Sequence, residues 1–272
     1  PARPPDRGAC LMTPLDIAHD AMETASEDAS ARLRFYDCLA GAELFLLLAD
    51  EAEGDAIRPQ IFPIEGQSLV LAFDQEERLS AFVDGAAAPY AVLTGRCLAE
   101  MLASQSMGLG LNLGVAPSAI ILDAAAMTWL AETLSARPDE VEETPEELSA
   151  PVGVPEPVLT AIDSKLAAAG GLAKMAYLAL AQYAGGRTAH LVAFIDPLPG
   201  AEPALANAVT EALTFSGIEA GSLDIAFFKA SDQVAASLAR VGLRFDLPEA
   251  EAKSQTPGAA PGMDPSKPPK LR

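Results

Sequence analysis

Apolar residues alternate between two spacings from Thr13 to about residue 248, and this alternation restricts the folds open to the chain. Segments such as 28–41 repeat apolar residues every three or four positions, which is typical of helices with one buried face. Segments such as 43–50 are short apolar runs that end at acidic turn residues, which indicates buried strands. Helices and strands interleaved in this way predict an α/β (α+β) protein.

One stretch, residues 135–157, interrupts the pattern. It is rich in proline and carries seven acidic side chains against the single Arg137, so its net charge is −6. Self-repulsion and proline both favour an extended linker. We therefore expect two mixed-sheet domains with helices packed on the sheets, an N-terminal domain at 12–135 and a C-terminal domain at 156–248. An acidic linker at 136–155 would join them.

The two ends of the chain show no apolar periodicity. Residues 1–11 are rich in proline and arginine, and residues 249–272 in proline, glycine, alanine and lysine. Such compositions cannot bury a core, so we expect a disordered extension and a disordered tail. Met12 resembles a natural start, because Thr13 can cap a helix and Pro14 suits its first position.

Charge and cysteine content narrow the function classes. The net charge is −20, which disfavours nucleic acid and anionic membrane surfaces as partners. No apolar run approaches the roughly 18 residues that a spanning helix needs. Cys10, Cys38 and Cys97 show no paired spacing, which favours a reducing cytoplasm. Because the two histidines, His19 and His190, fall in different predicted domains, we expect no metal site. We also expect no cofactor.

The segment 108–119 raises the question of a phosphate-binding loop, because it holds three glycines in seven positions. A dinucleotide loop needs its third glycine where Leu113 stands, and a helix after it. Gly108 and Gly110 instead alternate with leucines, which predicts a strand whose glycine face another group approaches closely. Asn112 and Gly114 then suit a turn with positive φ.

Cys97 is the one candidate nucleophile. It lies in the first turn of a predicted helix beside Arg96, a setting that can lower a thiol pKa. A nucleophilic cysteine also needs a general base, and neither histidine has a local relation to it. The alternative is that Cys97 is a small buried hydrophobic residue on the same helix face as Met101, and this is the interpretation we favour.

Residues 90–96 join a predicted strand to a helix, and loops in such positions bind ligands in open α/β sheets. Together with the predicted turn after residue 111, they supply the candidate binding residues. These are Tyr90, Thr94, Gly95, Arg96, Asn112 and Gly114.

Several segments of this sequence resemble the SseB family, named for an enhanced serine-sensitivity phenotype. In the N-terminal half they are "MTPLDIAHDAM", "LVLAFDQEERLSAF", "PYAVLTGRCLAEMLA" and "GLGLNLGVAPSAIIL"; in the C-terminal half they are "AHLVAFIDP" and "GIEAGSLDIAFFKASD". The resemblance covers about 12–248 and implies the same division into two domains. It implies no catalytic residue and no cofactor. The family commonly has Asn-Pro-Gly in the turn, where this chain has Leu113 in place of the proline.

Two hypotheses of function follow. The first is a non-enzymatic cytoplasmic module for protein interaction or regulation, whose acidic surface favours basic protein partners and salt-sensitive association. The alternative is an unrecognised enzyme or redox protein that uses Cys97 as a reactive thiol. The sequence leaves the oligomeric state open.

Overall fold

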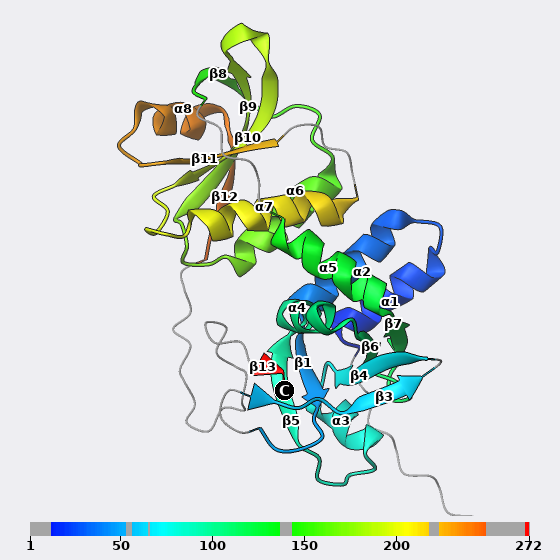
Figure 1. Cartoon of the computed structure of the whole chain (residues 1–272). Coiled ribbons are helices and arrows are strands. Elements are labelled where there is room, and N and C mark those ends of the chain that lie inside the picture. The colour runs from blue at the N-terminus through cyan, green and yellow to red at the C-terminus, as the bar shows by residue number, and fades with distance from the viewer. Residues whose placement is uncertain are drawn as a thin grey trace, which may run out of the picture. The chain divides into compact units, whose positions relative to one another are not determined.

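The computed structural model describes residues 12–52, 56–64, 66–136, 143–217, 223–248 and 270–271. The chain divides into two compact units. The N-terminal unit runs to Glu132 and includes the segment from Thr256 onward, and the C-terminal unit covers Thr133–Gln255. The described residues form eight α-helices and two mixed sheets, which confirms the predicted α+β fold class with two sheet-containing regions (Figure 1).

The N-terminal unit is built on a six-stranded sheet with the order β5-β1-β4-β6-β7, to which β3 adds by pairing with β4. The strands are β1 (Glu43–Leu47), β3 (Ile61–Ile64), β4 (Gln67–Phe73), β5 (Tyr90–Thr94), β6 (Gly108–Leu111) and β7 (Ile120–Leu122). Only β4 and β6 pair in parallel within this described sheet. A hairpin joins β3 and β4, since Ile64 pairs with Gln67 across the turn between them.

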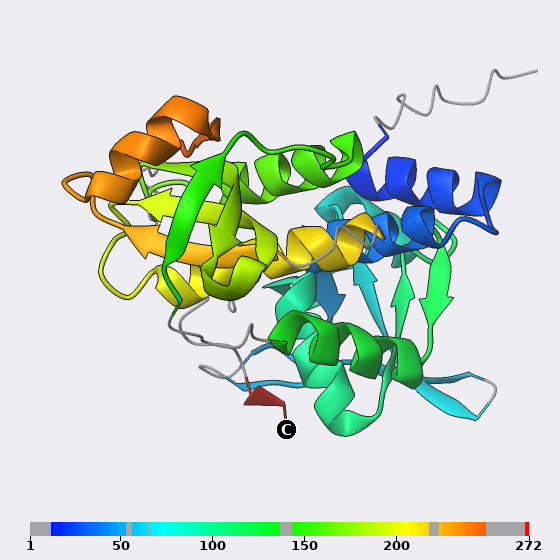
Figure 2. The same cartoon turned by 90° about the horizontal axis from the view of Figure 1, so that it is seen from above.

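Five helices accompany this sheet: α1 (Pro14–Thr24), α2 (Ala29–Gly41), α3 (Glu76–Phe82), α4 (Gly95–Gln105) and α5 (Ala124–Ser135). Figures 1 and 2 show α1 and α2 side by side from two directions. The predicted start of α1 is confirmed, since Thr13 and Asp16 form a reciprocal capping box with Pro14 at the first position. On one face of the sheet, Leu79 of α3 packs against Leu71 and Phe73.

A further pair of short strands belongs to the N-terminal unit. Strand β13 (Lys270–Leu271) pairs in parallel with β2 (Ala56–Ile57). These two residues correct the prediction of a tail without structure at 249–272, because backbone pairing to a strand needs no apolar period. Residues 1–11 and the remainder of the predicted tail lie outside the described residues.

The C-terminal unit is built on a five-stranded sheet with the order β11-β10-β9-β12, to which β8 adds by pairing with β9. The strands are β8 (Pro145–Ser149), β9 (Met175–Tyr183), β10 (Thr188–Ile195), β11 (Leu223–Phe228) and β12 (Leu243–Asp246). A tight turn at Ala184–Gly186 connects β9 and β10, as the glycines predict. Helix α7 (Glu202–Ser216) connects β10 to β11, and these two strands are parallel.

Helices cover both faces of this second sheet. The core on one face includes Val158 and Ile162 of α6 (Glu156–Ala168) and Leu205 of α7. On the other face, Ala235 and Leu238 of α8 (Gln233–Val241) pack on the sheet. The central strands β9 and β10 therefore bury side chains in two directions, which explains their nearly continuous apolar runs in the sequence.

Part of the predicted linker is a strand. Residues 145–149 form β8, which pairs antiparallel with β9. Only Leu148 of this strand packs against the core, while Glu146 and Glu147 are exposed. An edge strand can form with little apolar surface. The acidic composition of β8 therefore indicated a linker rather than a strand. The prediction of a linker over 136–155 therefore fails for these five residues.

Candidate functional site

The glycines of β6 serve close packing. A Cβ at Gly108 would lie 2.5 Å from Leu69 Cδ2 and 2.6 Å from the Leu122 carbonyl oxygen. One at Gly110 would lie 2.6 Å from Leu71 Cδ2. The element that follows is strand β7 rather than a helix, so no helix N-terminus faces these glycines. The structural interpretation of this segment is confirmed.

The turn after β6 has positive φ at the two predicted positions, 49° at Asn112 and 74° at Gly114. Asn112 is fully buried, and its side chain bridges two parts of the unit. Its Oδ1 accepts the Asp74 N–H at 3.1 Å, and its Nδ2 donates to Ser118 Oγ at 2.9 Å. Asn112 therefore acts as a structural bridge beneath the surface, where no ligand in solvent can reach it.

Asn112 belongs to a buried polar network that the sequence analysis missed. Arg78 Nη1 donates to Asp16 Oδ1 at 3.0 Å and to Asp74 Oδ1 at 2.8 Å, and its Nη2 pairs with Asp16 Oδ2. Thr13 Oγ1 donates to Asp74 Oδ2 at 2.6 Å. The Asp16 and Arg78 side chains are only 1% and 3% exposed. We call these four residues, together with Asn112 and Ser118, the buried network.

The buried network joins α1 to the sheet and to α3. Burial by itself would raise the pKa of Asp16, but hydrogen bonds from Arg78, Ser118 and the Thr13 backbone outweigh it and hold that pKa well below its ordinary range. Asp16 is therefore ionised at neutral pH. Its oxygens are already engaged, so the network suits a structural lock better than acid–base chemistry. The i, i+4 spacing of Asp74, which precedes α3, and Arg78 within it was the available sequence signal.

The structure separates the candidate binding residues. Strand β5, which precedes 95–96, lies at one edge of the sheet, and strands β1 and β4 stand between it and β6. Thr94 caps α4 by accepting the Cys97 N–H at 3.3 Å. A Cβ at Gly95 would lie 1.8 Å from the Leu39 carbonyl oxygen, so Gly95 permits close contact between α2 and α4.

Tyr90 and Arg96 lie at opposite ends of this strand-to-helix segment. The Tyr90 hydroxyl donates to Glu76 Oε1 at 3.1 Å. Burial and this hydrogen bond both raise the pKa of Tyr90, so the side chain stays neutral. Arg96 is half-buried in the first turn of α4. The six candidate residues therefore lie at two separate places, the β5–α4 segment and the turn after β6.

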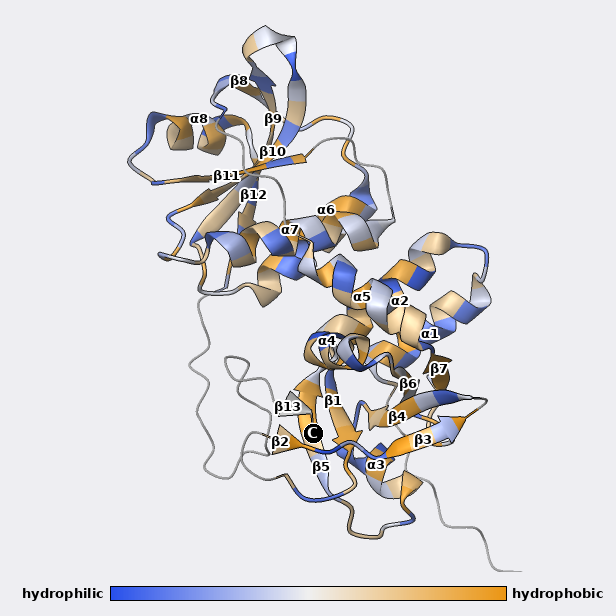
Figure 3. Cartoon of the chain, viewed as in Figure 1, coloured by the Kyte–Doolittle hydropathy of each residue, from blue (hydrophilic) through white to orange (hydrophobic). Residues whose placement is uncertain are grey.

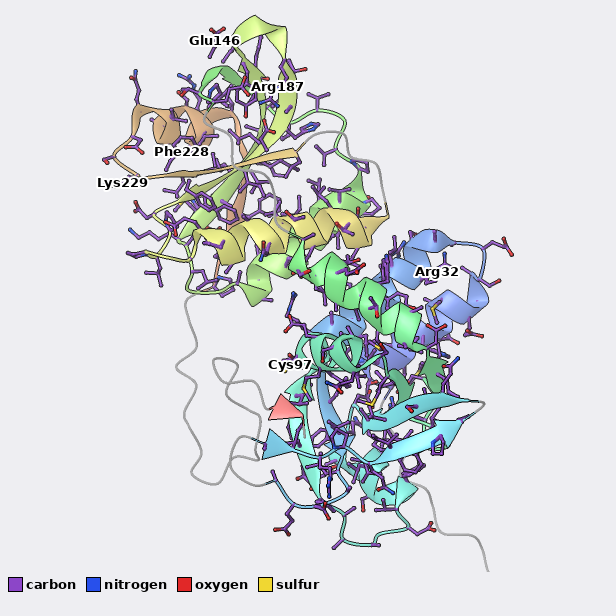
Figure 4. The ribbon with its side chains drawn as sticks, viewed as in Figure 1. Arg32, Cys97, Glu146, Arg187, Phe228 and Lys229 are labelled. Atoms are coloured by element: carbon purple, nitrogen blue, oxygen red, sulfur yellow. The ribbon has the colours of Figure 1, made fainter. Side chains whose placement is uncertain are left out.

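The environment of Cys97 fits the interpretation that we favoured, a partly buried helix residue beside Met101. The thiol is half-buried on α4 (Figure 4), with its Sγ 4.0 Å from Met101 Sδ. Burial, and next the charge of Glu100, raise its pKa, whereas an activated thiol needs a lowered one. Arg96 therefore does not give Cys97 the lowered thiol pKa that its position in the sequence allowed. Among the described residues, no three His, Cys, Asp or Glu side chains gather as metal ligands.

A hollow opens at the end of β7 in the N-terminal unit. Its volume is about 310 Å³. It is lined by side chains of α2, the β3–β4 hairpin, β7 and the start of α5. These are Tyr36, Ile64, Gln67, Leu69, Ile121, Leu122, Asp123 and Ala126. We call it the β7 hollow. No pattern in the sequence predicts it, because four separate segments assemble it.

Exposed apolar side chains surround the β7 hollow. Ile121 is 48% exposed and Trp129 is 38% exposed. The Trp129 ring packs edge-on against Tyr36, with 5.0 Å between ring centroids. Figure 3 shows the hydrophobic character of β3, whose Ile64 also lines the hollow. Asp123 contributes a negative charge at the rim and accepts the Ala126 N–H at 2.7 Å.

Comparison with known proteins identifies the N-terminal unit. The model of the SseB protein N-terminal domain matches residues 19–129, which include α2 to β7 and every residue lining the β7 hollow. No curated protein and no solved structure matches the chain. Over the described residues, no helix combines the length and apolar character needed to cross a bilayer.

Proposed function

The chain belongs to the SseB family through its N-terminal domain, and we propose that it is a non-enzymatic protein-interaction module of the cytoplasm. Its binding site would be the β7 hollow together with the open edge of β7. The observation that carries this proposal is the exposure of Ile121 and Trp129 beside a hollow at a sheet edge. Exposed apolar side chains grouped around a concavity mark interaction sites.

The free edge of β7 determines the kind of partner. Within the described sheet, β7 pairs with β6 on one side and with no strand on the other. An extended peptide can add to such an edge through main-chain hydrogen bonds, while a neighbouring hollow receives one of its side chains. The partner we propose is therefore an extended segment of another protein.

The volume and lining of the hollow determine which side chain it accepts. At about 310 Å³ it lies at the lower end of the range for ligand pockets. Its lining includes the buried side chains of Leu69 and Leu122 and the ring of Tyr36. A single large apolar side chain, such as phenylalanine or leucine, suits this space.

Charge determines what flanks that side chain. The chain carries a net charge of −20, and Asp123 lies at the rim of the hollow. Complementary charge speeds association and selects partners, so lysine or arginine should flank the apolar residue. Because salt screens such attraction, binding should weaken as ionic strength rises.

Trp129 provides an intrinsic signal for the test. It is the one tryptophan in the chain and contacts Tyr36 of the hollow. The probes are tryptophan-free peptides of about seven residues, with a central phenylalanine between β-branched residues and lysine at both ends. Peptides with aspartate at the ends serve as controls. We expect saturable changes in Trp129 fluorescence with the lysine peptides, and a smaller affinity at high salt.

A matched pair of variants locates the site. Ile121→Ser removes an exposed isoleucine at the hollow, and Ile17→Ser removes one on α1 that is 59% exposed. We expect Ile121→Ser to weaken peptide binding about tenfold, the effect of losing an interface anchor worth about 1.4 kcal/mol. Ile17→Ser should leave affinity unchanged. Equal affinities for the two variants, or no binding by any lysine peptide, would overturn the proposal.

A further inference from the structure

Among the strands that the structure describes, none pairs with the outer edge of β11 in the C-terminal unit. β11 pairs in parallel with β10 over six residues, from His190 opposite Leu223 to Ile195 opposite Phe228, without a register shift. No other strand of the described sheet pairs with β11. All six of its residues are half-exposed, although the strand packs on both faces of the sheet.

The hydrogen bonds show which backbone groups face outward. The Asp196 N–H donates to the Phe228 carbonyl oxygen at 2.9 Å, so the backbone of Phe228 faces β10. Successive residues of a strand direct their N–H and C=O groups to alternate sides. Ile225 and Phe227 must therefore direct theirs away from β10, toward the open edge.

This edge lacks the features that usually prevent pairing. Edge strands are commonly protected by proline, by inward-pointing lysine or by bulges. β11 has the sequence LDIAFF and a regular register. Its one charged residue, Asp224, is paired with Arg187 Nη1 at 2.9 Å. Arg187 and the end of the strand, Phe228 and Lys229, are marked in Figure 4.

We propose that β11 pairs with β11 of a second copy of this chain, antiparallel and centred on Ile225. In that register Ile225 lies opposite its own copy, Leu223 opposite Phe227, and Asp224 opposite Ala226. Leu223, Ile225 and Phe227 are partly buried and pack against the core beneath α6 and α7, so this pairing would bring the two cores together. A two-fold axis through a self-complementary patch is the commonest symmetry of dimers.

Local charge favours a second copy over a basic peptide. Asp224 within β11 and Lys229 just after its end carry opposite charges. The edge is therefore locally balanced, although the whole chain carries a net charge of −20. No like charges lie directly opposite in the proposed register, which avoids the repulsion that would select against it. The two whole chains still repel, so dimerisation should strengthen with salt. This is the reverse of the dependence expected for peptide binding at the β7 hollow.

Sedimentation equilibrium of the full chain tests the proposal, with Ile225→Pro and Ile225→Ala as a matched pair. Both shorten the side chain, but only proline removes the outward N–H, which β10 does not use. Because of the two-fold axis, one substitution removes two intermolecular hydrogen bonds. We expect Ile225→Pro to raise the dimer dissociation constant about 100-fold relative to Ile225→Ala, at about tenfold per bond.

Hydrogen exchange provides a test without substitution, in case Ile225→Pro disturbs the fold. The Ile225 and Phe227 amides should exchange quickly in dilute protein and slowly at concentrations where the dimer forms. The Ala226 and Phe228 amides, which face β10, should exchange slowly at both. A monomer at all concentrations and salts, or protection of Ile225 that is independent of concentration, would overturn the proposal and leave the peptide-binding site unaffected.

Discussion

Replacing Arg78 with methionine should destabilise the N-terminal unit severely. Methionine retains a long unbranched side chain but removes the guanidinium that bonds both Asp16 and Asp74. Those carboxylates are 1% and 5% exposed, so solvent cannot replace the lost donor. The substitution therefore leaves two buried negative charges without their cation.

The size of this destabilisation follows from the burial of the ion pairs that Arg78 makes. Removing one partner of a buried ion pair costs about 3–5 kcal/mol. A domain has about 5–15 kcal/mol of stability in total, so this loss would unfold the unit at moderate temperature or denaturant. A matched control is Arg58→Met, because Arg58 pairs with Asp50 at 2.9 Å with both side chains about two-thirds exposed. Surface pairs of this kind contribute about 0–1 kcal/mol.

Urea unfolding followed by tryptophan fluorescence measures both variants. The only tryptophan, Trp129, lies in the N-terminal unit, so its signal reports that unit alone. We expect a much lower urea midpoint for Arg78→Met and nearly the wild-type midpoint for Arg58→Met. Similar midpoints for the two variants would refute the view that the buried network holds this unit together.

The pH dependence of the unfolding free energy provides a second test of the buried network. The folded-state pKa of Asp16 lies below its ordinary value of about 3.8, so the carboxylate contributes stability above that pH and loses it as the pH falls through the folded-state pKa. In Arg78→Met, loss of the guanidinium should raise the pKa of Asp16, because burial then opposes its charge with only the Ser118 and Thr13 hydrogen bonds against it. The difference in unfolding free energy between wild type and Arg78→Met should therefore shrink below about pH 4.

Three further predictions concern single residues. Gly95→Ala should lower the stability of the N-terminal unit by about 3 kcal/mol, because its Cβ would lie 1.8 Å from the Leu39 carbonyl oxygen; Gly41→Ala, with nothing within 4 Å, should raise it by about 0.5 kcal/mol in the same urea titration. Asn112→Ala should cost about 3 kcal/mol, from two buried hydrogen bonds and a left-handed backbone, and a midpoint shift below a third of that expected would contradict it. A variant with Cys97 as its sole cysteine should react with iodoacetamide at pH 7 more slowly than free cysteine does; faster reaction would restore the reactive-thiol alternative.

Local signals in the sequence predicted most of the secondary structure. The helix start at Thr13 and the glycine strand β6 each depend on neighbours along the chain. Strand β8 was missed because a single side chain, Leu148, reaches the core and glutamates fill the rest. Short edge strands carry too little apolar surface to show a period.

The interactions that matter most for function and stability join distant segments. Asp16 and Arg78 are 62 residues apart, and Ser118 is 102 residues from Asp16. The β7 hollow is lined by residues from Tyr36 to Ala126. No periodicity or spacing rule relates such positions, since sheet order brings them together. At 90–96, Tyr90, Thr94 and Gly95 make contacts within their own chain, which the sequence pattern alone did not indicate.

Site-specific photo-crosslinking in cells that make the protein tests the central claim most directly. A benzophenone side chain replaces Ile121 in one variant and Ile17, an exposed isoleucine distant in the sequence, in the other. The account predicts that position 121 crosslinks to a protein at a short apolar segment flanked by lysine or arginine, identified by mass spectrometry, and that position 17 does not. The same crosslinks from both positions, or none from position 121, would contradict it.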